Sequence, residues 1–390
     1  MRALSEAKSG FALRLAGLYA ATFIVLGVQL PFFPVWLKAK GLDAELIGLV
    51  LAIPMFVRVF AILVAARAAD RYDRLRGAII VTSCASFAGY TLVGLADGAP
   101  AIIVTYVLAS LAFAPVMPLV DAYALRGLSA RGQAYGPVRM WGSAAFVAGS
   151  FATGFATDVL PARDLIWLMV AAILLGALAS FSLAPLPPAV APLSAPAQTR
   201  GSLLRNPAFL AVLAAASLIQ ASHAVYYGFS TLEWRLAGLG GGAIAGLWAL
   251  GVVAEIVLFA LSGRLPPALT PTVLIMIGAG GAVLRWSAMA LDPPVLLLPW
   301  LQLLHALTFG TTYLGALSFA ARSAPPGQSA SAQGYLAVAA GVVMAGAMGL
   351  SGLLYAAFAG LAYAAMALMA VAGGACAFVA YRLGRRVAPL

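Results

Sequence analysis

Long apolar segments follow one another along almost the whole chain, and each is long enough to cross a membrane as a helix. A helix needs about 20 apolar residues to span a bilayer. On that measure we predict twelve spans, at residues 11–37, 44–66, 77–96, 100–125, 133–157, 164–184, 208–233, 243–263, 271–291, 294–320, 329–353 and 357–382. This pattern predicts an all-α integral membrane protein.

The composition agrees with a chain that is solvated by lipid. Of the 390 residues, 63% are hydrophobic and only 9% are charged, whereas soluble domains carry about 25% charged residues. The net charge of +11 does not indicate nucleic-acid binding, because the basic residues are scattered over short loops. Cys84 and Cys376 lie far apart in apolar runs, without a zinc or disulfide pattern. We expect no metal and no cofactor, and we interpret the N-terminal apolar run as a spanning helix, not a signal peptide.

An internal duplication divides the chain into two halves. Three motifs recur at an offset of 198 to 200 residues: Trp36 at Trp234, Gly48-Leu49 at Gly246-Leu247, and Gln133-Ala-Tyr135 at Gln333-Gly-Tyr335. The longest polar interruption, residues 185–206, is rich in Pro, Ala and Ser. We therefore predict two pseudo-symmetric six-helix halves, residues 1–184 and 207–390, joined by a cytoplasmic linker of residues 185–206. In such folds the binding site lies near the midplane between the halves.

The basic residues predict the orientation of the chain in the membrane. Sixteen of them fall on one side of the predicted bundle, and four fall on the other side: Lys38, Lys40, Arg163 and Arg235. Basic loops remain in the cytoplasm, so we expect both termini to be cytoplasmic.

Charged residues inside the predicted spans mark a functional site, because a charge in hydrocarbon is costly unless a partner or water meets it. Asp121 and Arg139 each lie about five residues inside the same end of spans four and five. Their equal depth predicts an ion pair. Glu255 lies near the middle of span eight and is a candidate proton carrier. Arg285 in span nine and His305 in span ten complete a second cluster.

Three more polar residues lie inside spans. His223 is in span seven, Gln29 is in span one, and Arg58 is in span two. Both histidines also have a structural interpretation as hydrogen-bonded packing residues. Arg58 has one as a structural partner of Asp121 or of a more distant acid.

Several of these residues carry a family resemblance. PFFPVWL (31–37), Asp121 with GPVRMWG (136–142), Glu255, Arg285 and His305 together resemble the lactose permease-type symporters of the major facilitator superfamily. The resemblance covers almost the whole chain. It implies that Asp121 and Arg139 belong to the substrate cavity, and that Glu255, Arg285 and His305 serve proton coupling and gating. ARAADRYDRLRG (66–77) is similar to the signature between spans two and three, with Asp70-Arg71 retained and the usual glycines absent.

The chain departs from the lactose type in two places. Thr308 stands where that type has a second acid one turn after the histidine, and span seven offers His223, Tyr226 and Tyr227 in place of an acid. The segments SHAVYYGF (222–229), LWALGVVAEIVLFALS (247–262) and VRMWGSAAFVAGS (138–150) more closely resemble the phenylpropionic acid permease branch. That branch implies an aromatic carboxylic acid as substrate. Trp36 and Trp248 are further candidates to flank an aromatic ring.

We therefore expect a monomeric inner-membrane transporter that carries a compound such as phenylpropionate together with protons. The candidate substrate-binding residues are Gln29, Arg58, Asp121, Arg139, His223, Tyr226 and Tyr227. A sugar or nucleoside proton symporter of the same fold remains an alternative, and so does a facilitator without proton coupling, because Thr308 replaces an acid. The duplication and the absence of a catalytic motif argue against an integral-membrane transferase enzyme.

Overall fold

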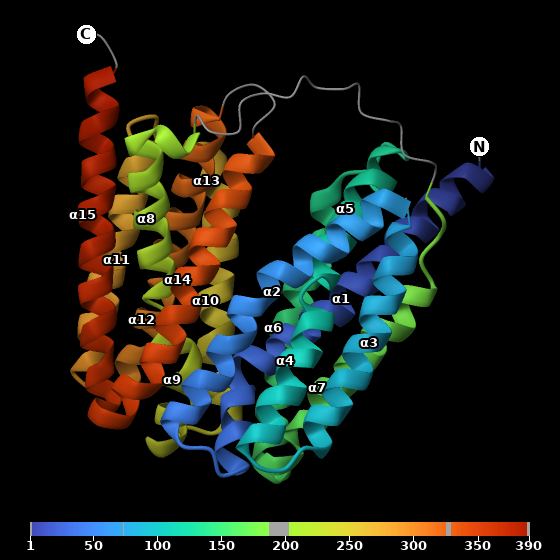
Figure 1. Ribbon diagram of the computed structural model, residues 1–390, viewed down its shortest axis with the longest axis horizontal. Helices are drawn as coiled ribbons and strands as arrows, with labels where there is room; N and C mark the ends of the chain where they lie inside the picture. The colour runs from blue at the N-terminus through green and yellow to red at the C-terminus, as the bar shows by residue number, and fades with distance from the viewer. Residues whose placement is uncertain (1, 73, 187–202, 325–328, 388–390) are drawn as a thin grey trace. The chain divides into compact units, whose positions relative to one another are not determined.

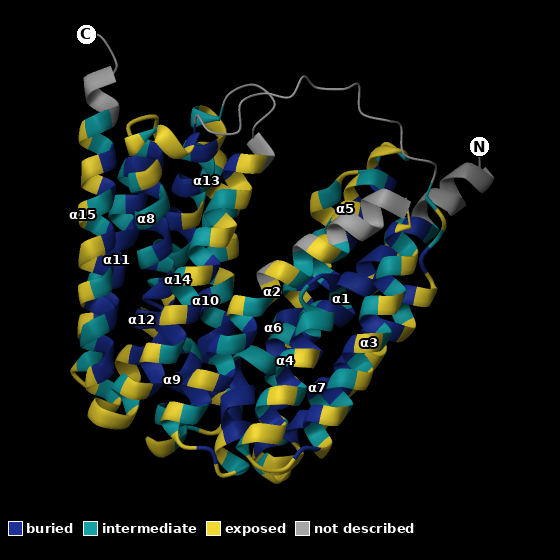
Figure 2. Ribbon diagram, in the orientation of Figure 1, coloured by how far each residue is buried: buried dark blue, intermediate teal, exposed yellow. Residues whose placement is uncertain are grey.

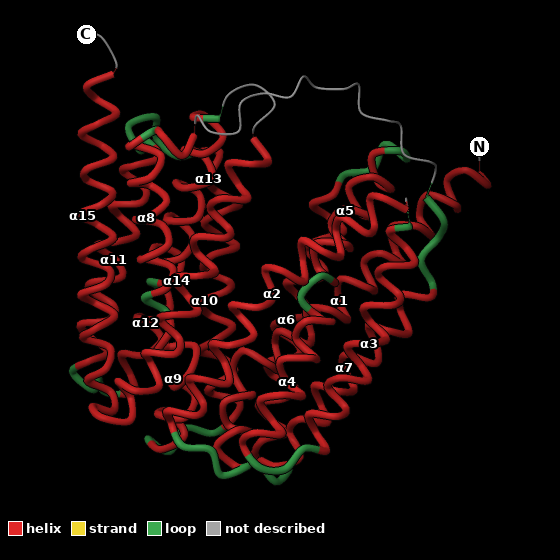
Figure 3. The backbone as a smooth tube through the Cα atoms, in the orientation of Figure 1, coloured by secondary structure: helices red, strands yellow, loops and turns green. Residues whose placement is uncertain are grey.

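The described part of the chain is helical almost throughout and contains no β-strand (Figure 3). The computed structural model describes residues 2–72, 74–186, 203–324 and 329–387; the side chains of residues 2–9, 59, 63, 66–72, 329–330 and 384–387 are not described. The helices in Figure 1 are α1 (Arg2–Ala39), α2 (Ala44–Tyr72), α3 (Leu75–Leu95), α4 (Ala99–Phe113), α5 (Val116–Ser129), α6 (Tyr135–Val159), α7 (Leu165–Phe181), α8 (Pro207–Ala221), α9 (Ala224–Leu236), α10 (Gly241–Leu261), α11 (Pro271–Ala290), α12 (Leu298–Leu303), α13 (Thr312–Ser323), α14 (Ser329–Phe358) and α15 (Tyr363–Val387).

Each of the twelve predicted spans coincides with a helix or with a pair of consecutive helices. By length and apolar composition, ten stretches of the described chain could cross a membrane. The last of these, Ser331–Leu383, contains both α14 and α15, which the short 3₁₀ helix η6 (Ala359–Ala362) separates. The helix α6 is 25 residues long but is not among the ten, and it contains Arg139 and Asp158. Counting α6 and separating α14 from α15 gives twelve spans.

Three spans that the sequence predicts as continuous are broken in the structure. Span four consists of α4 and α5, with Pro115 at the N-cap of α5; proline has no N–H for the helical hydrogen bond. Span seven consists of α8 and α9, separated at Ser222 and His223. Span ten consists of α12, a π-helical turn η5 (Ala306–Thr311) and α13. The latter two breaks lie at candidate site residues.

The chain forms two compact units, each described here by itself. The first contains residues 1–191 and 231–249, and the second contains residues 192–230 and 250–390. Residues 231–249 belong to the first unit through contacts with α6: Arg235 Nη2 donates to Thr157 O (3.1 Å) and the Gly241 N–H donates to Asp158 Oδ1 (2.9 Å). The predicted halves instead place residues 231–249 in the second half. The predicted boundaries of the halves, at residues 184 and 207, remain a proposal.

Small residues hold α1 and α6 close together in the first unit. A Cβ atom on Gly27 would overlap the carbonyl oxygen of Phe146, and one on Gly149 would lie 2.9 Å from the carbonyl oxygen of Ile24. Ser150 Oγ donates to the carbonyl oxygen of Gly27 across the same interface (3.1 Å). Glycine and serine let helix backbones approach in this way. In the second unit, α11 packs against α13 and α15, while α8 packs against α14 and α15.

Large apolar side chains are exposed on both units, as expected for helices that face lipid. In α3 the exposed residues Val81, Leu92 and Leu95 lie on the face opposite to the buried Ile79 and Tyr90. Figure 2 shows exposed and buried residues alternating along the other helices as well. Lipid tails are as apolar as these side chains, so a membrane removes the cost of exposing them to water.

Candidate functional site

A fully buried arginine is the centre of the polar network in the second unit. Arg285 lies on α11 with none of its surface exposed. Its Nη2 donates to Gln302 Oε1 (2.6 Å), and its Nη1 lies 3.1 Å from His305 Nδ1 and 3.4 Å from Thr308 Oγ1. A buried charge is tolerated only where hydrogen bonds satisfy it. The three partners, Gln302, His305 and Thr308, all come from span ten.

The π-helical turn η5 positions the partners of Arg285. It begins directly after His305 and contains Thr308. Turns of this kind are rare and occur frequently at functional sites. Gln302 precedes the turn at the end of α12, and it is fully buried. One broken span therefore supplies three side chains to one guanidinium.

His305 connects Arg285 to Glu255. The guanidinium can only donate, so the nearby His305 Nδ1 must accept, and the proton of the neutral ring is then on Nε2. That Nε2 lies 3.7 Å from Glu255 Oε2. The Glu255 side chain is 20% exposed, whereas Arg285 is not exposed at all. Glu255 is therefore the solvent-accessible end of the series Arg285–His305–Glu255.

His223 forms a second branch from Arg285. Its Nδ1 lies 3.0 Å from the carbonyl oxygen of Gln220 and 3.2 Å from that of Ile219, so Nδ1 carries the proton. These two carbonyls lie in the last turn of α8, where a helix leaves acceptors unpaired. The acceptor Nε2 then receives a hydrogen bond from Thr308 Oγ1 at 2.9 Å. His223 thus has the structural role of a helix cap and also extends the network.

Aromatic rings surround the guanidinium of Arg285. Its Cζ lies 4.7 Å from the ring centroid of Tyr226 and 4.6 Å from that of Trp286. The ring of Tyr227 stacks on His223 with centroids 5.7 Å apart. Cation–π contacts of this kind stabilise a buried arginine. Both predicted tyrosines therefore lie in the network, but Tyr226 contacts the arginine directly.

The predicted ion pair between Asp121 and Arg139 is not formed in the described structure. Asp121 Oδ1 accepts hydrogen bonds from Tyr19 (2.6 Å) and Tyr135 (2.9 Å). The guanidinium of Arg139 instead lies over the rings of Phe23 (3.9 Å) and Tyr19 (5.5 Å). Equal depth does not by itself produce an ion pair, because Tyr19 contacts both side chains. Both residues remain candidates for substrate binding.

Gln29 and Arg58 both lie near Tyr106 in the first unit. Gln29 Nε2 donates to the Tyr106 hydroxyl (2.9 Å), and Arg58 interacts electrostatically with the same hydroxyl. Arg58 is exposed, and no hydrogen bond or ion pair joins it to another described residue. The structural pairing of Arg58 with Asp121 is therefore not formed.

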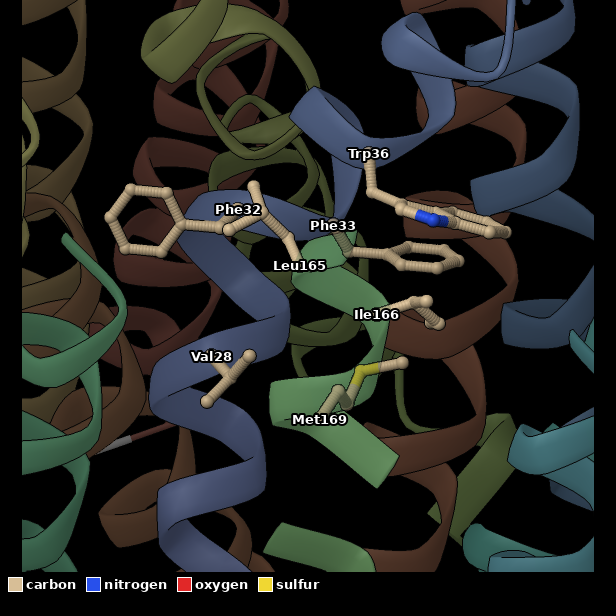
Figure 4. Close-up of a pocket in the computed structure, with 7 residues that line it drawn as sticks. All are labelled: Val28, Phe32, Phe33, Trp36, Leu165, Ile166 and Met169. Carbon is tan, nitrogen blue, oxygen red and sulfur yellow. The ribbon is translucent and has the colours of Figure 1, made fainter. Parts of the chain in front are cut away.

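The two candidate tryptophans are buried in the first unit. Trp36 Nε1 donates to the carbonyl oxygen of Arg163 (3.0 Å), and Trp248 Nε1 donates to Thr231 Oγ1 (3.0 Å). Trp36 also stacks on Phe33, with ring centroids 5.4 Å apart (Figure 4). The apolar cavity beside this pair measures only about 10 Å³, close to the volume that admits one water molecule. This cavity is too small for an aromatic acid.

Sequence reasoning missed Gln302 and Tyr19. Each is a single polar group within an apolar span. For Gln302 there is a spacing signal, because it precedes His305 by three residues and the two therefore share a helix face. The sequence identifies Thr308 only as the residue that replaces an acid, and it does not reveal the hydrogen bonds of its hydroxyl to Arg285 and His223. The side chains of Asp70 and Arg71, the retained part of the signature between spans two and three, lie outside the described residues.

The apolar spans define a class, the multi-pass membrane proteins, and charged groups inside them are typical of a transport pathway. Comparison with known proteins gives the family: the model of the MFS_1 like family matches residues 12–366. The chain therefore belongs to this family of the major facilitator superfamily, and it is a secondary transporter and not an enzyme. The expected fold and class are confirmed. The apolar helices and the bacterial relatives fit a multi-pass inner-membrane protein.

Two relatives show the extent of the sequence similarity. The chain is 35% identical over 322 residues to the probable 3-phenylpropionic acid transporter of Escherichia coli (strain K12), covering 78% of this chain and 80% of that protein. It is 28% identical over 313 residues to the maltose permease of Geobacillus stearothermophilus, covering 79% and 78%.

The solved structures support the fold. A point mutant of the nucleoside transporter NupG superposes with a TM-score of 0.82 at 16% identity, covering 96% of this chain and 99% of that one. A bacterial homologue of the human lysosomal transporter Spinster gives a TM-score of 0.74 at 17% identity, covering 95% and 96%.

Proposed function

We propose that this transporter carries a small aromatic carboxylic acid together with a proton, as a monomer with both termini in the cytoplasm. The observation that carries the proposal is the series Arg285–His305–Glu255 in the second unit. It joins an anion-binding group to a carboxyl group through an imidazole. The relative that is named a probable 3-phenylpropionic acid transporter supports this substrate class.

Arg285 can serve as the anchor for a substrate carboxylate. Its Nε and the Nε2 of Gln302 are buried, and neither has a hydrogen-bond partner among the described residues. Both are donors, and a guanidinium can bind both oxygens of a carboxylate. Since Arg285 is fully buried here, the substrate reaches it only after a rearrangement.

Substrate binding at Arg285 would change the protonation of His305. In the described arrangement Arg285 donates to His305 Nδ1 and so excludes a second proton from the ring. When Arg285 turns to a carboxylate, Nδ1 is free to accept a proton. The imidazolium can then pair with Glu255 across the existing 3.7 Å contact. Carboxylate and proton would therefore bind together, with no net charge moved.

We propose the other candidate residues as part of the substrate-binding site. Gln29, Arg58, Asp121 and Arg139 are the candidate substrate-binding residues of the first unit. His223, Tyr226 and Tyr227 are those of the second unit.

A sugar symporter is a second candidate, because the maltose permease is also a relative of this chain. Arg285 favours an anion over a neutral sugar, because it is a buried positive charge whose Nε has no hydrogen-bond partner among the described residues. A facilitator without proton coupling is the third candidate, because Thr308 is not an acid.

Uptake into proteoliposomes distinguishes these candidates. Purified protein is reconstituted and tested with 3-phenylpropionate, its uncharged amide, maltose and a nucleoside, each with and without an inward proton gradient. We expect the gradient to drive accumulation of the acid only. Accumulation of maltose or of the nucleoside would contradict the substrate class. Protein-dependent entry of the acid that the gradient does not accelerate would contradict proton coupling.

A further inference from the structure

A basic cavity lies in the first unit, and none of the described residues that line it is assigned to transport. It has a volume of about 280 Å³, close to the lower end of the range for small-molecule sites, about 300 Å³. None of the described residues that line it is acidic; they are Arg74, Leu75, Arg76, Gly77, Ile80, Arg126, Pro185 and Leu186. The cavity therefore brings together three arginines from the start of α3 and the last turn of α5.

The start of α3 adds to the positive potential of the cavity. Its N-cap residue, Arg74, makes no capping hydrogen bond with its side chain, and the first turn of the helix contains no acid. The first N–H groups of a helix have no partner within it and carry partial positive charge. Three arginines that line one cavity beside such a helix end give it a positive potential. This arrangement is suited to a phosphate group.

Arg76 has unused donor capacity at the cavity. Its Nη2 reaches the carbonyl oxygen of Phe181 at the end of α7, at the long distance of 3.4 Å. Its Nε is buried and has no hydrogen-bond partner among the described residues. This buried donor is a second observation, independent of the helix end, and it indicates that the cavity is suited to an anion.

The rest of the wall is apolar. Leu75, Ile80, Pro185 and Leu186 line the cavity beside the arginines. Leu75 and Leu186 also belong to the hydrophobic core around Tyr19 and Tyr123. A free phosphate would leave this apolar surface unused, whereas a lipid would cover it with its glycerol and acyl groups.

We propose that the cavity binds the phosphate group of an anionic phospholipid of the surrounding membrane. The basic side of the bundle is the cytoplasmic side under the expected orientation, where basic pockets between helices bind lipid headgroups. The proposal does not depend on the transported substrate.

Native mass spectrometry of the full chain tests the proposal. Detergent-purified protein is titrated with phosphatidylglycerol, with phosphatidylcholine and with inorganic phosphate. The test variant is the double substitution Arg74→Gln and Arg126→Gln, which leaves the Arg76 contact to α7 intact. The matched control is Arg264→Gln with Arg322→Gln, two exposed arginines of the second unit.

We expect phosphatidylglycerol to bind the wild type and the control equally and the test variant about 30-fold more weakly, which corresponds to ~1 kcal/mol for each basic residue. Phosphatidylcholine should bind weakly to all three proteins. Equal binding of phosphatidylglycerol to the test variant would overturn the proposal, and so would equal binding of the two lipids to the wild type. Binding of inorganic phosphate without retention of phosphatidylglycerol would overturn the assignment to a lipid. The thermal midpoint of each variant confirms that it is folded.

Discussion

The Nη1 atom of Arg285 lies 3.1 Å from Nδ1 of His305, so a permanent donor faces the nitrogen on which a second proton would be placed. From Arg285, hydrogen-bond donation runs outward in two directions. One runs to His305, whose Nε2 faces Glu255, and the other runs through Thr308 to His223. A change in the partner of Arg285 therefore alters both branches.

Glu255→Gln should abolish accumulation against a gradient and preserve substrate exchange. Glutamine keeps the size of the side chain and cannot take part in proton release. Accumulation and counterflow in proteoliposomes measure the two activities separately. Asp292→Asn is the matched control, because Asp292 is the other acid of the second unit and is exposed. Wild-type accumulation by Glu255→Gln would remove this residue from proton coupling.

Gln302→Leu should weaken substrate binding, because Arg285 loses its 2.6 Å partner. A hydrogen bond to a charged group is worth about 1.5–3 kcal/mol, which corresponds to about 10- to 150-fold in affinity. Gln302→Glu keeps the acceptor and adds a charge that holds Arg285 more tightly, so we expect it to bind the acid even more weakly although it folds normally. KM values for 3-phenylpropionate measure both effects. If Gln302→Leu keeps the wild-type KM, Gln302 does not position Arg285.

Thr308→Val should be damaging and Thr308→Ser should be tolerated. The hydroxyl links Arg285 to His223 by hydrogen bonds, and its loss leaves buried groups unpaired at a cost of about 1–3 kcal/mol. The thermal midpoint and the uptake rate measure the loss. Thr311→Val is a matched control on the same turn, since the Thr311 hydroxyl donates only to the carbonyl oxygen of Leu307. Equal effects of the two valine substitutions would mean that Thr308 has no special role.

In the first unit, Asp121 should be coupled more strongly to Tyr19 than to Arg139. The Tyr19 hydroxyl donates directly to Asp121, whereas Arg139 lies over the Tyr19 ring and makes no ion pair with Asp121 in the described structure. Double-mutant cycles with Tyr19→Phe, Asp121→Asn and Arg139→Gln measure these couplings, and residues in direct contact show about 0.5–3 kcal/mol. A larger coupling between Asp121 and Arg139 would indicate that an ion pair forms during transport.

The spans could be predicted from the sequence because a bilayer imposes one length on every apolar helix. Proline is a sequence signal for the break at Pro115, although Pro31 and Pro54 lie inside unbroken helices. The breaks at His223 and after His305 could not be predicted, because hydropathy is the same on both sides of each break. Arg285, His305 and Glu255 are recognisable in the sequence as ionisable side chains in apolar surroundings, and the structure brings them together. The hydrogen bonds that set the tautomers of His223 and His305 depend on η5 and on the end of α8, which the sequence pattern does not reveal.

One proton is expected to enter with each molecule of acid through the Arg285–His305–Glu255 series. The most direct measurement is the external pH of a weakly buffered proteoliposome suspension when 3-phenylpropionate is added without a gradient. Because the protonated acid also crosses lipid, protein-free vesicles provide the baseline. We predict a protein-dependent alkalinisation that tracks uptake of the acid and is absent with the amide and with Glu255→Gln protein. Protein-dependent uptake of the acid without alkalinisation above that baseline would contradict the coupling of acid entry to proton entry.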